Sequence, residues 1–446
     1  MTQSKAAEAP KASFKAKFGW AMFDFANSSY TTVIITVVYC NIFTALVVGD
    51  QGGTDPEFRR GNFLWDIGLF ISYILCVVTG PVFGAIMDFS ASKKKFLFMS
   101  YILTVVATAA LFLVSPGAAW LGVILLILSN FGFASGESFV ASFLPSLGNK
   151  DELGKISGIA WGVGYFGGLL SVIVATLGPL ADNSAANFEN LRFVGPITAA
   201  FFLVAAIPTF LWLKEPGDAQ ALPAGESFIS VGFSRLRTTL HEVKDFRDLA
   251  IFLLSLFFAS AGLGIVITYA FRYGAQVIHW SRETEKLMFI ITQFTAFGGA
   301  IGFGYLQDKI GAKLTYGITL VLWVSAILAI FLNDVLATML GIQREQAFLI
   351  VGCLAGASLG ATQSAGRAVV GILSPESKSG EFFGLWGLST KLAVAIGVLG
   401  TGALQTQLGL KNSILFCAVL FIVGLLISIP VNLKRGEKMA MEHEGE

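Results

Sequence analysis

Two stretches of the sequence decide the fold class, "GAIMDFSASKKKF" (Gly84–Phe96) and "GYLQDKIGAKL" (Gly304–Leu314). We call them the first and the second repeat stretch. In each, an aspartate comes four residues after a glycine, and a lysine comes five residues after the aspartate. The two aspartates, Asp88 and Asp308, are 220 residues apart (308 minus 88). We interpret this pattern as one multi-helix unit that occurs twice in the same orientation.

The composition indicates the class of protein that contains this unit. Of the 446 residues, 55% are hydrophobic and 13% are charged, whereas a soluble domain carries about 25% charged residues. Apolar runs of about 20 residues recur, and each is long enough to cross a hydrocarbon core about 30 Å thick as a helix. The sequence therefore predicts an all-α polytopic membrane protein with two six-helix bundles. The twelve expected transmembrane helices are residues 18–48, 62–87, 96–115, 119–142, 156–180, 193–213, 249–271, 285–306, 313–333, 346–369, 381–406 and 412–432.

The segments between the spans define the expected domains. The longest polar segment contains "KEPGDAQALPAGES", which is typical of a linker, followed by a stretch that fits a short amphipathic helix. Most of the 30 Lys and Arg residues fall on the side of the two termini, which predicts that both termini are cytoplasmic. We expect a cytoplasmic N-terminal segment at 1–17, an N-terminal bundle at 18–213, a cytoplasmic linker at 214–248, a C-terminal bundle at 249–433 and a cytoplasmic tail at 434–446.

Charge and motif content argue against several classes of function. A net charge of +1 gives no reason to expect a nucleic-acid partner. The four cysteines lie inside apolar runs without metal-ligand spacing, and the three histidines are scattered. No catalytic triad or paired-carboxylate site can be assembled from the sequence. We therefore expect no enzyme activity, no cofactor and no metal.

The two repeat stretches fit a gate at the cytoplasmic ends of the spans. Glycine allows two helices to approach closely, and aspartate can accept hydrogen bonds from a neighbouring helix N-terminus. The alternative is that any polar loop collects such residues, but the pattern occurs at both related places. The predicted gate residues are Gly84, Asp88, Lys94, Gly304, Asp308, Gly311 and Lys313.

The twelve spans and the repeat stretches resemble the major facilitator superfamily of transporters. Further stretches resemble one group within it, the vacuolar amino-acid effluxers linked to autophagy and their bacterial relatives of unknown substrate. They are "DFANSSY" (24–30), "SFLPSL" (142–147), "GKISGIAWGVGYFGG" (154–168), the region 363–367 and "EFFGLWGLSTK" (381–391). In the group's pattern serines flank the arginine of the tenth span, whereas Gly366 and Ala368 flank Arg367 here. The resemblance implies that the first, fourth, seventh and tenth helices line a central cavity, flanked by the second, fifth, eighth and eleventh.

Polar residues inside the spans are the candidates for this cavity. A charge at the centre of a lone membrane helix costs about 3 kcal/mol, so such a residue should face the bundle interior or water. Glu137 and Lys391 should lie near the midplane, where they could hold the two ends of a zwitterion, and a desolvated carboxylate could carry a proton. The main candidates for the substrate or proton pathway are Asp24, Asn27, Glu137, Gln363, Arg367 and Lys391.

Structural roles are the alternative for several polar residues. Asp24 and Arg367 could form an ion pair that only fixes packing or gates two states, and Asp66 could act in the same way. Aromatic residues in membrane helices more often pack or lie at the interface than bind ligands. The weaker cavity candidates are Asp66, Trp161, Tyr165, Tyr269, Gln293 and Trp386.

Secondary active transport is the expected function. We expect a monomer in a bacterial inner membrane, surrounded by lipid, that moves a small polar or zwitterionic metabolite such as an amino acid by alternating access between the bundles. Proton coupling is left open. The alternatives are a multidrug or cation antiporter, for which the 40 phenylalanines allow an apolar pocket, and a non-transporting receptor or scaffold of the same fold.

Overall fold

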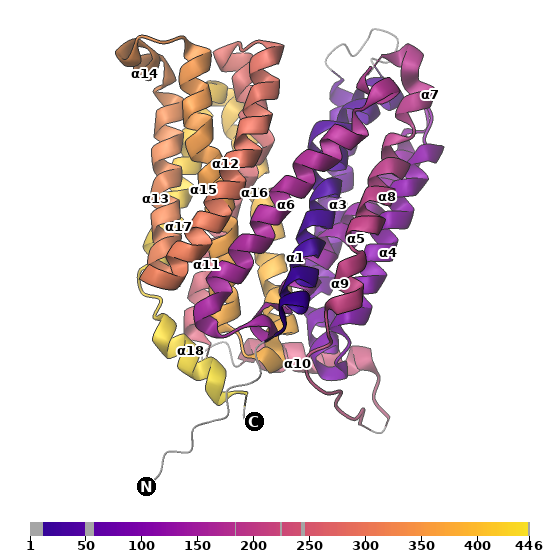
Figure 1. Ribbon diagram of the computed structural model, residues 1–446, viewed down its shortest axis with the longest axis vertical. Helices are drawn as coiled ribbons and strands as arrows, with labels where there is room; N and C mark the ends of the chain where they lie inside the picture. Colours follow the sequence, from indigo (N-terminus) through magenta and orange to yellow (C-terminus); the bar gives the residue numbers. More distant parts are fainter. Residues whose placement is uncertain (1–11, 50–57, 183, 224, 242–245, 445–446) are drawn as a thin grey trace.

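The computed structural model describes residues 12–49, 58–182, 184–223, 225–241 and 246–444. Every regular element within these residues is a helix. The helices form two bundles side by side, the first in indigo to magenta and the second in orange to yellow (Figure 1). The predicted all-α membrane fold with two six-helix bundles is thus confirmed. We call the side on which α1 begins and α18 lies the termini side, and the opposite side the far side (Figure 1).

The first bundle contains the helices that precede the linker. Its first span changes from α to π hydrogen bonding after Ser29, and its sixth is interrupted between α8 and α9, next to Pro208. The bounds are α1 (Phe14–Ser29), η1 (Tyr30–Val37), α2 (Tyr39–Ile42), η2 (Phe43–Val48), α3 (Arg59–Ser90), α4 (Lys93–Ala110), η3 (Leu111–Leu113), α5 (Ala119–Ala141), η4 (Leu144–Leu147), η5 (Lys150–Glu152), α6 (Leu153–Ala175), η6 (Gly178–Ala181), η7 (Ala185–Asn187), α7 (Phe188–Leu191), α8 (Val194–Ala205) and α9 (Ile207–Trp212).

The linker helix α10 (Phe228–His241) lies across the termini side and packs against α3 (Figure 1). The second bundle follows it and ends in the short helix α18 below the bundle. The bounds are α11 (Arg247–Tyr273), η9 (Gly274–Ile278), α12 (Arg282–Ile310), α13 (Ala312–Phe331), α14 (Asn333–Leu340), α15 (Arg344–Leu373), η10 (Glu376–Lys378), α16 (Ser379–Ser413), α17 (Leu415–Ser428) and α18 (Leu433–Glu442).

Polar side chains cap the starts of several helices. The Ser13 hydroxyl accepts the backbone N–H of Ala16 in the first turn of α1, and the Ser281 hydroxyl accepts that of Thr284 in the first turn of α12. Gln343 and Gln346 form a reciprocal capping box at the start of α15. Such caps satisfy backbone donors that have no partner inside the helix. The sequence therefore defines these starts locally.

The last two spans differ from the prediction in shape. Eleven described helices are long and apolar enough to cross a membrane, and a twelfth is obtained when a pair bent by 60°, Gln407–Ser413 and Leu415–Ser428, counts as one span. The 60° bend lies between Ser413 and Leu415. A separate kink inside α16 lies at Gly409, whose φ of 73° is a left-handed conformation that favours glycine. Helix α17 itself has only 14 residues. The predicted boundary at 406–412 therefore corresponds to a bend rather than a loop.

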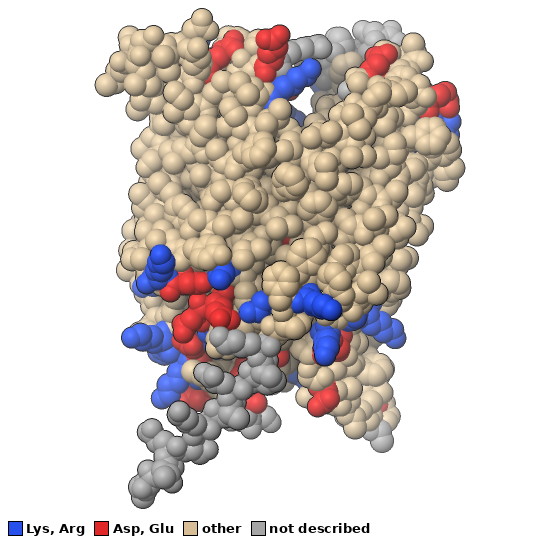
Figure 2. Space-filling view, in the orientation of Figure 1, with Lys and Arg blue, Asp and Glu red and all other residues tan. Residues whose placement is uncertain are grey.

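The most extensive contacts between the bundles are those of α3 with α16 and of α6 with α12, towards the termini side, and α6 with α15 and α5 with α16 add smaller ones. Glycines make these contacts possible, because a Cβ at Gly84 would overlap the carbonyl oxygen of Gly380, and a Cβ at Gly158 would lie 2.9 Å from the Cα of Gly304. Towards the far side the bundles diverge (Figure 1). Figure 2 shows the surface hollowed between them on that side. The protein is closed on the termini side in this state.

Candidate functional site

An ion pair joins the two bundles near the middle of the spans. The Nζ of Lys391 on α16 donates to Oε2 of Glu137 on α5. Both side chains are partly accessible, at 15% for Lys391 and 18% for Glu137. The helices meet closely here because Gly387, one turn before Lys391, lies against Ser138. Two residues that were predicted to hold a zwitterion are therefore brought together and neutralise each other in this state.

A second inter-bundle ion pair is more deeply buried. Nη1 of Arg367 on α15 lies 2.7 Å from Oδ2 of Asp24 on α1. Arg367 also donates to the hydroxyl (3.1 Å) and the carbonyl oxygen (3.2 Å) of Ser157. Its guanidinium carbon lies 4.6 Å from the ring centroid of Trp20 and 5.1 Å from that of Trp161. Arg367 is 1% exposed, so its charge depends on these contacts within the membrane.

The third polar link between the bundles is a hydrogen bond. The hydroxyl of Tyr165 on α6 donates to Oε1 of Gln363 on α15. Asn27 on α1 is buried at 7% exposure. Its Oδ1 has no hydrogen-bond partner among the described residues, and neither has Nε1 of Trp161. The site therefore offers a free buried acceptor and a free buried donor. The formal charges of the two ion pairs in this site, Glu137–Lys391 and Asp24–Arg367, sum to zero.

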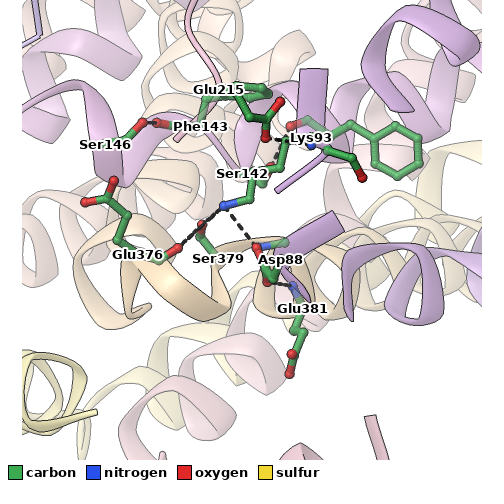
Figure 3. Close-up of polar contacts among 12 residues, drawn as sticks. Asp88, Lys93, Ser142, Phe143, Ser146, Glu215, Glu376, Ser379 and Glu381 are labelled. Atoms are coloured by element: carbon green, nitrogen blue, oxygen red, sulfur yellow. Dashed lines mark hydrogen bonds and ion pairs between the residues drawn. The ribbon is translucent and has the colours of Figure 1, made fainter. Parts of the chain in front are cut away.

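At the first repeat stretch, a network of polar contacts crosses between the bundles (Figure 3). Asp88 accepts from the backbone N–H groups of Gly380 (3.0 Å) and Glu381 (2.9 Å) at the start of α16. Lys93 pairs with Oδ1 of Asp88 at 2.9 Å and donates to the Ser379 hydroxyl at 2.7 Å. The Asp88 and Lys93 side chains are 0% and 4% exposed. A carboxylate at a helix N-terminus is stabilised by the unpaired N–H groups and the helix dipole.

The side chain of Lys94 lies within the first bundle. Its Nζ donates to the carbonyl oxygen of Leu213 at 2.8 Å, whereas Lys93 reaches the second bundle. Sequence reasoning named Lys94 for the gate because the run of three lysines alone does not tell which one points inward. The linker adds a contact that sequence reasoning missed, since Arg235 of α10 pairs with the fully buried Glu381 at 2.8 Å.

The second repeat stretch makes weaker contacts between the bundles. Asp308 is exposed and accepts one backbone N–H, that of Lys155 near the start of α6, at 3.3 Å. Gly304 provides the close approach, because a Cβ there would lie 2.8 Å from the carbonyl oxygen of Gly154. This side of the interface therefore depends on helix packing more than on charge.

Two predicted gate residues of the second repeat stretch have their contacts, as far as the described residues show, within the second bundle. Gly311 has a φ of 93° and forms the turn before α13, with open space where a side chain would be. Nζ of Lys313 donates to the carbonyl oxygen of Ile429 at the end of α17, at 2.5 Å. The structure thus places both in the second bundle.

The remaining candidates are spread along the cavity helices. Asp66 is exposed on the far side of α3, and Gln293 is half-buried on α12. Tyr269 is 5% exposed, with the Arg272 guanidinium 5.5 Å from its ring centroid. Trp386 is 7% exposed and packs within α16. None of these four is part of the inter-bundle polar contacts described above.

Sequence reasoning missed the residues that surround the charges. Ser157 and Trp20 contact Arg367, and the rings of Tyr73 and Phe133 lie 5.9 and 6.0 Å from Nζ of Lys391. Phe133 precedes Glu137 by four residues and so lies on the same face of the helix. This spacing was the only feature of the sequence that could have indicated a residue near Glu137. Within the described residues, no group of three or more His, Cys, Asp or Glu side chains could hold a metal.

Comparison with known proteins identifies the family. Residues 69–441 match the family model described as vacuole effluxer Atg22 like. An uncharacterized MFS-type transporter of Bacillus subtilis, YxiO, is 25% identical over 422 residues, which cover 93% of this chain and 94% of the relative. The autophagy-related protein 22 of Yarrowia lipolytica is 22% identical over 71% of this chain, and the match spans 57% of the length of that relative.

Solved structures agree with this assignment at the level of the fold. The human organic anion transporter MFSD10 superimposes with a TM-score of 0.71 at 15% identity, covering 93% of this chain and 99% of that one. The proton:xylose symporter XylE gives a TM-score of 0.69 at 14% identity, covering 93% and 94%. The protein therefore belongs to the Atg22-like family of major facilitator superfamily transporters.

Proposed function

We propose that the protein is a secondary active transporter that moves a small zwitterionic, amino-acid-like metabolite by alternating access. The observation that carries this proposal is the Glu137–Lys391 ion pair, because its two charges come from different bundles and are partly accessible. A zwitterion inserted between them gains an ammonium–carboxylate contact on each side and replaces the pair without leaving a charge unpaired. The neutral sum of the site favours a substrate with no net charge.

The places where the bundles touch support the proposal of alternating access. In this state the α3–α16 and α6–α12 contacts close the termini side. We place that side in the cytoplasm of a bacterium, with the protein as a monomer in the inner membrane, so that the hollow in Figure 2 opens to the outside. Opening towards the cytoplasm requires these contacts and the ion pair between Asp24 and Arg367 to separate.

Proton coupling is proposed at Asp24. A proton on its carboxylate removes the attraction to Arg367 at a contact that must break before the termini side opens. The proton thus favours the transition between states. An Asp24→Asn variant that retains exchange but loses the pH dependence of net flux is the expected outcome. Unchanged pH dependence in that variant would contradict the coupling role.

Counterflow in proteoliposomes tests the substrate proposal. Labelled amino acids, simple amines, organic acids and sugars are offered to vesicles preloaded with the same unlabelled compound. We expect exchange of neutral amino acids and a loss of at least tenfold in both Glu137→Gln and Lys391→Ala, because each leaves one charge without its partner. Wild-type exchange in both variants contradicts the proposal, as does an absence of exchange for every amino acid.

Two surface variants serve as matched controls. Glu189→Gln removes a carboxylate whose side chain is 81% exposed, and Lys438→Ala removes an ammonium whose side chain is 75% exposed. Both change the net charge by the same amount as the test variants. Exposed ion pairs contribute about 0–1 kcal/mol, so exchange should remain at the wild-type rate. A similar loss in the controls would point to a general effect of charge.

A further inference from the structure

We propose that Tyr73, Phe133 and Glu137 form a pocket of the first bundle for a primary alkylammonium group, and that Lys391 fills this pocket with its own ammonium in the present state. The pocket is a specific site within the region described above, and the three residues come from α3 and α5. The link to transport rests on the proposed function, whereas the pocket itself can be tested without any flux measurement.

The pocket belongs to one bundle and its occupant to the other. Lys391 extends from α16 of the second bundle, and its Nζ reaches Glu137 on α5. Its neighbour Ser389 donates to the carbonyl oxygen of Leu253 on α11 at 3.0 Å, so that part of α16 is held against its own bundle. Lys391 must therefore leave the pocket when the bundles separate at this level. The carboxylate then needs another cation.

Aromatic faces complete the pocket around that carboxylate. Nζ of Lys391 lies 5.9 Å from the ring centroid of Tyr73 and 6.0 Å from that of Phe133. These distances are within the range in which a cation is attracted to an aromatic ring, an attraction that changes affinity about two- to thirty-fold. A carboxylate together with two rings is a site for an organic ammonium ion, whose methylene groups pack against the rings. A small hydrated metal ion would gain little from them.

Packing within the first bundle holds the pocket in shape. The Phe133 ring stacks on Tyr30 with centroids 5.0 Å apart, and the Tyr30 hydroxyl is hydrogen-bonded to Ser129 at 2.7 Å. Ser129, Phe133 and Glu137 follow one another at four-residue intervals, so they share one face of α5. The stacking contact and the hydrogen bond are made without the second bundle. The pocket should therefore persist after Lys391 withdraws.

The consequence for transport is competition between two ammonium groups. A substrate ammonium that binds Glu137 displaces Lys391, which is then available for the substrate carboxylate. The empty protein keeps its own ion pair between the bundles, so the carboxylate is paired with or without substrate. Specificity for a primary ammonium then comes from Tyr73 and Phe133 as well as Glu137.

Chemical complementation of Lys391→Ala tests the pocket directly. This substitution removes three methylene groups and the ammonium, which together correspond to n-propylammonium. We expect n-propylammonium to raise the melting temperature of purified Lys391→Ala by about 2 °C or more at saturation, because a ligand that binds only the folded state stabilises it. n-Propanol, which has the same length and no charge, should give no such shift.

Three matched proteins define the result. Wild type and Lys391→Met still fill the pocket with a side chain and should not respond to n-propylammonium. The double variant that combines Glu137→Gln with Lys391→Ala lacks the carboxylate and should not respond either. Within the Lys391→Ala background, Tyr73→Leu or Phe133→Leu should weaken the apparent affinity about two- to thirty-fold, and Tyr73→Phe should retain it. The proposal is overturned by equal shifts in all proteins or by no shift in Lys391→Ala.

A variant that folds poorly still gives an answer. Lys391→Ala is then expressed with n-propylammonium, with n-propanol or with neither, and the monodisperse yield is compared by size-exclusion chromatography. A yield increased by n-propylammonium alone supports the pocket, and equal yields contradict it. Failure of amino-acid counterflow alongside a positive complementation result rejects the proposed substrate but not the pocket, and the reverse combination rejects the pocket alone.

Discussion

The two repeat stretches share a local sequence pattern but make different contacts. In the first, Asp88 is fully buried, accepts two backbone N–H groups of α16 and pairs with a buried lysine. In the second, the exposed Asp308 accepts one N–H of α6 at 3.3 Å. The described part of the linker adds a further ion pair next to the first, through Arg235 and Glu381. The α3–α16 contact is therefore held by charge and the α6–α12 contact mainly by small-residue packing.

A repeated sequence motif therefore does not contribute the same interaction energy at both of its positions. A buried ion pair that loses one partner costs about 3–5 kcal/mol, whereas an exposed pair contributes about 0–1 kcal/mol. The contact between α3 and α16 should therefore cost more free energy to break than the contact between α6 and α12 when the bundles separate.

Asp88→Asn should have the largest effect on stability. The substitution leaves the Lys93 ammonium buried without a full countercharge, which predicts a loss of about 3 kcal/mol or more. Asp308→Asn, at the exposed counterpart, should change stability by no more than about 0.5 kcal/mol. Thermal unfolding of both variants in the same detergent checks the comparison. Equal losses would mean that the two stretches contribute alike.

Gly84→Ala should open the termini side. Its Cβ would overlap the backbone of Gly380, and overpacking of this kind costs about 1–3 kcal/mol. Spin labels at the exposed positions Lys95 and Ser377 should report a longer distance across the α3–α16 contact. The matched control is Gly302→Ala, where a Cβ meets open space. A distance change of the same size in Gly302→Ala would show that overlap with Gly380 is not the cause of the opening.

Lys93→Met should affect the bundle contact and Lys94→Met should not. Lys93 contacts Asp88 and Ser379 across the interface, while Lys94 contacts Leu213 within its own bundle. We expect a loss of about 1–3 kcal/mol for Lys93→Met, since hydrogen bonds to charged groups are lost, and less for Lys94→Met. The same spin-label distance separates the two. A longer distance in Lys94→Met alone would reverse the assignment.

The smallest effect is expected at Asp334, which lies outside both repeat stretches. The hydrogen bond from Lys411 lowers the pKa of this half-exposed carboxyl, with Arg344 adding to the effect. A lowered pKa in the folded state stabilises the protein above the unfolded-state pKa of about 4, and the contribution is lost as the pH falls through the folded pKa. Asp334→Asn should slightly reduce the acid sensitivity of the melting temperature. The contrast between Asp88 and Asp308 should be unchanged in this background.

Much of the architecture follows from the sequence because membrane helices obey a local rule. Every backbone polar group in the hydrocarbon core must be satisfied within its own helix, so apolar runs of sufficient length predict the spans directly. The pairing of Asp24 with Arg367 was an expected alternative, and the structure brings the two together. Gly409 lies inside the boundary predicted at 406–412, but the sequence did not show that the chain kinks there without a loop, because residue type alone does not fix φ.

The candidate site could be predicted only in part. Buried charges are conspicuous in an apolar chain, so Glu137, Arg367 and Lys391 stand out without a structure. Their neutral neighbours do not, since a serine such as Ser157 or a ring such as Tyr73 is common in any membrane helix. Which lysine of the run at 93–95 turns inward depends on the helical phase of α4 relative to α16.

By itself the sequence determined the all-helical membrane class, the internal repeat and the buried charges, because each depends on residue type and spacing along one chain. The tertiary structure was needed to show that Glu137 and Lys391 pair with each other across the bundles, that Lys93 and not Lys94 reaches α16, and that the Asp88 side chain is buried whereas Asp308 is exposed. Those outcomes depend on the distance and rotation between helices far apart in the chain, which residue spacing along a single helix does not encode.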